Sequence, residues 1–95
     1  MNIDDIAQLT LQYGEGWAVS HAQRLLKLIE LIGADLEYDR QLLTYATYLY
    51  DWGAFPKFQQ TGVEHAIRSR QVAETDILPQ TDLTQVQIDL ILEAI

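Results

Sequence analysis

Apolar residues recur at spacings of three and four along nearly every segment of this 95-residue chain. No segment alternates apolar and polar residues for long enough to form a half-buried strand. Because spacings of three and four are those of an amphipathic helix, the sequence predicts an all-α fold, a helical bundle of about five helices. We expect residues 1–95 to form a single helical domain or part of one.

Glycines separate the first two predicted helices. The first helix covers residues 4–13, and Gly14 and Gly16 are expected to break it. The second helix begins near Trp17 and ends at Gly33. Its expected buried stripe consists of Trp17, His21, Leu25, Leu28 and Ile32.

A third helix follows Asp39, which is a suitable N-cap, and ends before Gly53 and Pro56. Asp51 falls in its last turn, where a carboxylate opposes the helix dipole. A nearby cation would explain the position of this carboxylate. The side chains expected to face inward from this helix are Leu42, Leu43, Ala46, Leu49 and Tyr50.

Two more helices complete the predicted bundle. Thr61 and Glu64 fit a capping box for a helix that runs to about Asp76 and has His65 in its first turn. Thr84 begins the last segment with a second capping box. The apolar stripe of this segment consists of Ile88, Ile91, Leu92 and Ile95. Because the stripe is still apolar at the last residue, it predicts a missing partner or a missing continuation.

Composition limits the function classes. The chain has 14 acidic and 6 basic residues, so its formal charge of −8 repels phosphate backbones, and we expect no nucleic-acid partner. No stretch approaches the roughly 20 apolar residues that span a bilayer, and acid stands near the N-terminus where a signal peptide is basic, so we expect a cytoplasmic protein without membrane association. Because the chain has no cysteine, a bound metal would need imidazole and carboxylate ligands.

Three residues could converge on one divalent cation. They are His21, Asp51 and His65, each in a predicted helix. Each also has a structural alternative: His21 could be a core histidine bonded to backbone, Asp51 could cap a turn, and His65 could be a surface residue. Both interpretations stay open for all three.

Three motifs resemble the HD-domain superfamily of metal-dependent phosphohydrolases. Residues 17–24 are similar to its first metal-binding helix. Residues 46–53 look like its Ala-x-x-Leu-His-Asp-x-Gly signature, with Tyr50 in place of the histidine. Residues 62–66 are similar to a segment in which many members carry a further histidine. In this chain the three motifs are Trp-Ala-Val-Ser-His-Ala-Gln-Arg, Ala-Thr-Tyr-Leu-Tyr-Asp-Trp-Gly and Gly-Val-Glu-His-Ala.

The resemblance implies hydrolysis of a small phosphorylated substrate, a phosphate ester or nucleotide, with a bound divalent metal ion. Mn²⁺, Fe²⁺, Ni²⁺, Co²⁺ and Mg²⁺ all suit imidazole and carboxylate ligands. His21, Asp51 and His65 match the metal-binding positions. Lys57 and Arg24 match basic positions of the family, and with Asp51 they are the implied catalytic residues, although both cations could instead be solvated.

Two departures from the family affect the expected activity. Tyr50 replaces a metal-binding histidine, and the family's closing aspartate would fall beyond Ile95. We therefore expect an incomplete site with weak or no activity, in a chain that is the N-terminal part of a larger domain. The alternative is a small helical module without catalysis, which forms a homodimer or docks a partner through exposed apolar helix faces.

Overall fold

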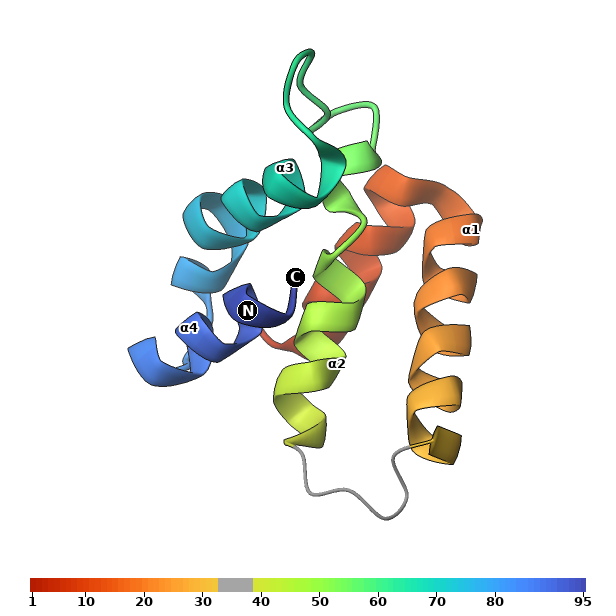
Figure 1. The fold of residues 1–95 in the computed structure, drawn as a ribbon, viewed down its shortest axis with the longest axis vertical. Coiled ribbons are helices and arrows are strands. Elements are labelled where there is room, and N and C mark those ends of the chain that lie inside the picture. Colours follow the sequence, from red (N-terminus) through yellow and green to blue (C-terminus); the bar gives the residue numbers. More distant parts are fainter. Residues whose placement is uncertain (33–38) are drawn as a thin grey trace.

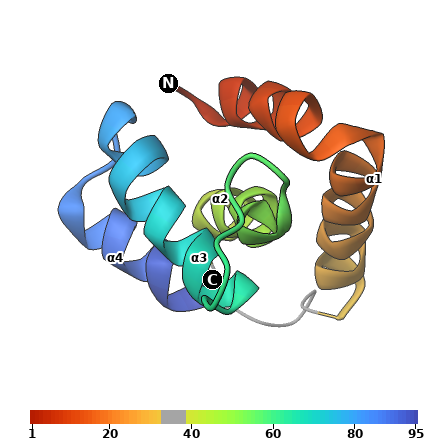
Figure 2. The ribbon, with the colours of Figure 1, turned by 90° about the horizontal axis from the view of Figure 1, so that it is seen from above.

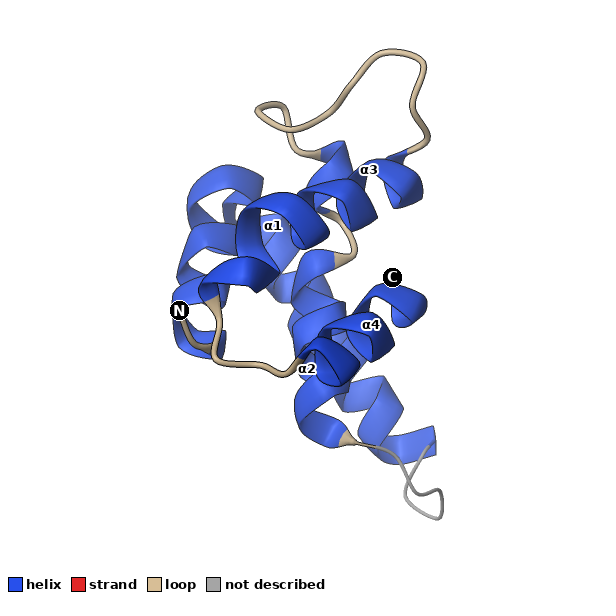
Figure 3. Ribbon diagram, turned by 90° about the vertical axis from the view of Figure 1, so that its left-hand side faces the viewer, coloured by secondary structure: helices blue, strands red, loops and turns tan. Residues whose placement is uncertain are grey.

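The protein is built from helices throughout residues 1–32 and 39–95, the part that the computed structural model describes, and this part contains no strand (Figure 3). The predicted all-α fold is thus confirmed. Four α-helices are joined by shorter helical turns. They are α1 (Ile3–Ile32), α2 (Arg40–Leu49), the 3₁₀ helix η1 (Trp52–Ala54), α3 (His65–Val72), the π-helical turn η2 (Ala73–Ile77), the 3₁₀ helix η3 (Leu78–Gln80) and α4 (Gln85–Ala94).

Helix α2 lies at the centre of the molecule, and the other helices surround it (Figures 1 and 2). It packs against α1 on one side and α4 on the other, while α3 packs against η1. This arrangement joins the helices in one apolar core. Its most deeply buried large side chains are those of Ile6, Leu49, Trp52, Phe55, Val72, Leu78 and Ile91.

The two helices expected at residues 4–13 and 17–33 are one continuous helix. The prediction that Gly14 and Gly16 end the first helix is therefore wrong. Instead, α1 changes direction part-way along its length, in the part of the ribbon that holds these glycines (Figure 1). Glycine weakens a helix by only about 1 kcal/mol, which packing can offset. Gly14 is buried against the ring of Phe55, where a Cβ atom would overlap that ring.

The buried side of α1 also differs from the expected stripe. Trp17 and Leu28 are 52% and 49% exposed, and the positions that face the core are Ala18 and Ala22. The small alanine side chains allow neighbouring elements to approach closely. His21 is consequently half-buried at the edge of the core. Gly33, the expected helix end, and the Ile32 side chain lie outside the described residues.

Two predicted helix caps are confirmed and one is wrong. Asp39 accepts a hydrogen bond from the Leu42 amide at 3.1 Å, and Thr84 forms a complete capping box at the start of α4. Thr61 caps nothing, because Gly62 adopts a positive φ of 83° and turns the chain before α3 begins at His65. The expected inward face of α2 is buried at Leu42, Ala46 and Leu49, and partly buried at Leu43 and Tyr50.

In the described residues, every helix is too short or too polar to cross a membrane.

Candidate functional site

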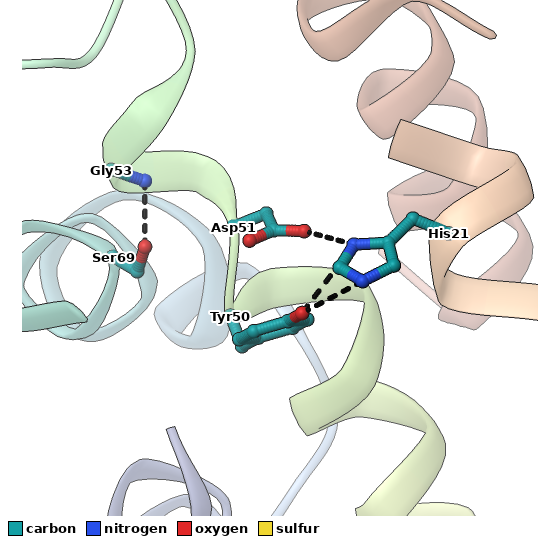
Figure 4. Close-up of polar contacts among 5 residues, drawn as sticks. All are labelled: His21, Tyr50, Asp51, Gly53 and Ser69. Atoms are coloured by element: carbon teal, nitrogen blue, oxygen red, sulfur yellow. Dashed lines mark hydrogen bonds and ion pairs between the residues drawn. The ribbon is translucent and has the colours of Figure 1, made fainter. Parts of the chain in front are cut away.

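His21 and Asp51 meet although 30 residues separate them in the sequence. Nδ1 of His21, on the second half of α1, lies 2.8 Å from Oδ2 of Asp51, which follows the end of α2 (Figure 4). The two side chains are 36% and 25% exposed, so solvent or a small ligand can reach them. His21 thus bonds to a carboxylate, and the Asp51 side chain makes no capping hydrogen bond.

The position of Asp51 is fixed by its neighbours. Asp51 precedes the short helix η1, and its carbonyl oxygen accepts a hydrogen bond from the Ala54 amide at 2.9 Å. The next side chain, Trp52, is fully buried, and its indole Nε1–H donates to the Thr10 hydroxyl oxygen at 3.2 Å. Because η1 is tied to the core in this way, the Asp51 carboxylate is directed toward α1.

The Tyr50 hydroxyl lies beside the imidazole ring of His21. Its oxygen is 3.2 Å from Nε2 and 3.4 Å from Nδ1, within hydrogen-bonding distance of both nitrogens (Figure 4). Tyr50 and Asp51, which are consecutive in the sequence, thus both contact the imidazole of His21.

Burial, together with the nearby negative charge of Asp51, raises the pKa of the Tyr50 phenol above its ordinary value of 10.0. The phenol is therefore neutral at neutral pH. A neutral phenol is a poor metal ligand, because the phenol must lose its proton to ligate well.

The other expected site residues lie apart from this pair. His65 is the first residue of α3 and its side chain is exposed. In residues 1–32 and 39–95, no group of three or more His, Asp or Glu side chains is arranged to hold a metal ion. The structure thus brings together His21 and Asp51 from the expected metal set, and does not add His65 to them.

The two expected basic residues are both exposed. Nζ of Lys57 is 3.2 Å from the Tyr13 hydroxyl oxygen and 4.4 Å from the centre of the Tyr13 ring, so this ammonium group packs on Tyr13. Arg24 follows His21 by three residues in α1, a spacing that places both on neighbouring positions of the helix surface. Arg24, unlike Lys57, therefore lies near the His21–Asp51 pair on the surface of α1.

The 2.8 Å between Nδ1 of His21 and Oδ2 of Asp51 is the length of a hydrogen bond or ion pair between the two side chains. Imidazole and carboxylate are also side chains that bind divalent ions. Two protein ligands are fewer than the three or four of zinc sites, and Mg²⁺ prefers oxygen ligands. A divalent ion at this pair would therefore need water or substrate atoms to complete its coordination.

Sequence reasoning missed an apolar cavity of about 260 Å³, open to solvent, that lies next to Tyr50. Tyr50 forms part of its wall. The spacing of Leu43, Ala46 and Tyr50 on α2 could have indicated that these residues share one face, but not what lies opposite them. The remaining lining residues come from α1, α2 and α4 and are Leu25, Ile29, Thr47 and Ala94.

Comparison of the chain with protein-family models, with curated proteins and with solved structures gave no match. The fold and the site geometry therefore define the class as an all-α protein with a histidine–aspartate pair.

Proposed function

We propose that this protein is an HD-domain-like, metal-dependent phosphohydrolase that acts on a phosphate ester or nucleotide with a weak, two-ligand metal site. The observation that supports this proposal best is the 2.8 Å contact between His21 and Asp51. These are the two residues of the family motifs that would have to meet in such a site.

The proposed roles follow from the position of each side chain. Nδ1 of His21 and Oδ2 of Asp51 would hold the ion at the open edge of the pair. A bound divalent ion supplies an acidified water and draws negative charge from the phosphoryl group. Arg24, on the same surface of α1, would attract the phosphate group, and a neutral Tyr50 would lie beside the imidazole.

Metal binding and hydrolysis provide the test. Calorimetric titration with Mn²⁺ and an assay of generic phosphate esters in Mn²⁺ or Mg²⁺ should give weak binding and slow turnover, both lost in His21→Ala and Asp51→Ala. His65→Ala is the control, and it should leave Mn²⁺ affinity unchanged. Turnover that survives His21→Ala would contradict the proposal. An equal loss of Mn²⁺ affinity in His65→Ala would instead indicate the three-residue site that the sequence predicts.

The exposed face of α4 favours a second candidate function, self-association with a second copy of the chain. Val86 and Leu90, four residues apart on one side of α4, are 69% and 49% exposed. Leu90 also borders a second apolar hollow of about 250 Å³ next to Leu42 and Leu43. Because each copy carries a charge of −8, a dimer through this face should strengthen as salt screens the repulsion.

Light scattering during size-exclusion chromatography tests the dimer. A dimer whose fraction rises with salt and that Leu90→Glu dissociates would support self-association. A monomer at every salt concentration would reject it.

A further inference from the structure

We propose that the substrate is a phosphate ester of a small apolar group, such as an aryl or short alkyl ester, and that the cavity beside Tyr50 binds this group. The proposal rests on the phosphohydrolase function proposed above and names its substrate class. It is carried by the cavity and by the position of Tyr50 between this cavity and the His21–Asp51 pair.

The walls of the cavity are suited to an apolar ligand. Leu25 and Ile29 line it from α1, Leu43 and Ala46 line it from α2, and none of its lining residues within 1–32 and 39–95 is charged. The hydroxyl of Thr47, one of its two polar lining residues, donates a hydrogen bond to the Leu43 carbonyl oxygen at 2.7 Å. A bound group would therefore meet aliphatic side chains and few free hydrogen-bonding partners.

Tyr50 lies between this cavity and the proposed reaction site. It belongs to the cavity wall, while its hydroxyl oxygen is 3.2 Å from Nε2 of His21. His21 in turn contacts Asp51. A single ester molecule could thus place its phosphate group at the His21–Asp51 pair and its organic group on the other side of Tyr50.

The size and the apolar walls of the cavity favour one of the two proposed substrate types, a phosphate ester or a nucleotide. An apolar cavity of about 150 Å³ can hold benzene, so a volume of about 260 Å³ accommodates one aromatic ring or a short alkyl chain. A nucleoside has ribose hydroxyls and base amide groups that would find few hydrogen-bonding partners among the aliphatic side chains of the cavity walls. The apolar ester is therefore favoured over the nucleotide.

Two phosphonates test this proposal without any hydrolysis. Phenylphosphonate and methylphosphonate have the same head group and differ in the apolar part, and neither has an ester bond to cleave. We expect NMR titration of the wild-type protein to give an affinity at least about tenfold higher for phenylphosphonate, because only its ring is buried. Methyl resonances of Leu25 and Ile29 should shift with phenylphosphonate and not with methylphosphonate.

Ala94→Phe should abolish the preference, because Ala94 lies at the mouth of the cavity on the exposed side of α4 and a larger side chain there fills the space. Gln12→Phe is the matched control: Gln12 is exposed on α1, does not line the cavity and leaves the charge unchanged. Circular dichroism would verify the fold of both variants.

Each outcome decides the proposal. Equal affinity for the two phosphonates, no binding of either, or a preference that survives in Ala94→Phe would overturn it. A preference that Ala94→Phe alone removes would support it. Failure of the hydrolase function would look different, because Mn²⁺ binding and turnover would be absent while the preference for the phenyl group persisted.

Discussion

The backbone amide of Gly53 donates a hydrogen bond to the hydroxyl oxygen of Ser69 at 2.6 Å, and both residues are buried (Figure 4). This bond joins η1 to the middle of α3. Because Gly53 is two residues after Asp51, the same bond helps to hold the carboxylate of Asp51 within reach of His21. The position of the site therefore depends on a contact that lies outside it.

Ser69→Ala should destabilise the protein by about 1–3 kcal/mol, because the buried Gly53 amide would lose its acceptor. The free energy of unfolding from urea titration measures the change. Ser20→Ala is the matched control at an exposed position of α1, and should change the free energy of unfolding by less than about 0.5 kcal/mol. Equal effects of the two substitutions would show that the Ser69 hydroxyl is not an important acceptor.

Two glycine substitutions should have opposite effects on stability. A Cβ atom at Gly53 would overlap the His65 carbonyl oxygen and the Ser69 amide nitrogen, so Gly53→Ala forces α3 away from η1 and should cost several kcal/mol, of the order seen for strained or overpacked positions. A Cβ atom at Gly16 meets nothing within 4 Å, so Gly16→Ala should stabilise α1 by about 0.5–1 kcal/mol. Thermal unfolding of both variants checks the pair, and a stabilising Gly53→Ala would contradict the observed packing.

Tyr50→His should increase the affinity for divalent ions. The substitution places an imidazole beside His21 and Asp51, where the neutral phenol now lies, so the pair gains a third ligand. We expect a gain of at least about tenfold in Mn²⁺ affinity by calorimetry, in line with the size of ligand effects at metal sites. Tyr50→Phe is the control because it removes the hydroxyl without adding a ligand. A similar gain in Tyr50→Phe would mean that the hydroxyl only blocks the site.

Stability should decrease above pH 10. Burial and the charge of Asp51 raise the pKa of Tyr50 above 10.0, and burial and Asp82 do the same for Tyr45. The folded protein therefore retains these phenol protons after the unfolded chain begins to lose them. The contribution of both groups is fully present below pH 10 and is lost as the pH rises through the folded pKa values.

Urea titrations between about pH 8 and pH 11 check this expectation against the ordinary tyrosine pKa. The double variant Tyr45→Phe/Tyr50→Phe should show a smaller decrease than the wild type above pH 10. The two proteins should have the same pH dependence near pH 8, well below the raised pKa values of Tyr45 and Tyr50. An equal decrease of stability above pH 10 in both proteins would show that Tyr45 and Tyr50 do not cause it.

Thr84→Ala should destabilise the protein by about 1 kcal/mol, because Thr84 and Gln87 form a reciprocal capping box at the start of α4. Thr61→Ala provides a direct comparison, since Thr61 has the same sequence pattern but is exposed in a turn before α3. It should leave the free energy of unfolding nearly unchanged. Equal losses would indicate that Thr61 also caps a helix in solution.

Helix content and some caps could be predicted because they depend on local sequence. Asp39 and Thr84 cap helices by bonding amides three residues away, a relationship that the spacing of residues already contains. The capping rule failed at Thr61, because the positive φ of Gly62 turns the chain before the helix begins. The expectation that glycine ends a helix failed at Gly14, because burial against Phe55 allows the helix to continue.

The candidate site also has features that the sequence indicated and features that it did not. The residue types at His21 and Asp51 indicated a shared ligand, and the structure places the two side chains in contact. Three features of the site could not be predicted: the separation of His65 from this pair, the contact of the Tyr50 hydroxyl with the imidazole, and the cavity next to Tyr50. Each of these features depends on how a side chain of one helix is oriented toward another helix.

The sequence by itself determined that this protein is helical, because the period of its apolar residues and two of its caps are local properties. Only the tertiary structure decided that α1 runs unbroken past its glycines, that Asp51 reaches His21 and that Tyr50 separates this pair from an apolar cavity. The physical reason is that burial and packing between distant segments supply more free energy than a single residue's helix preference, and their directions are set by all the helices together.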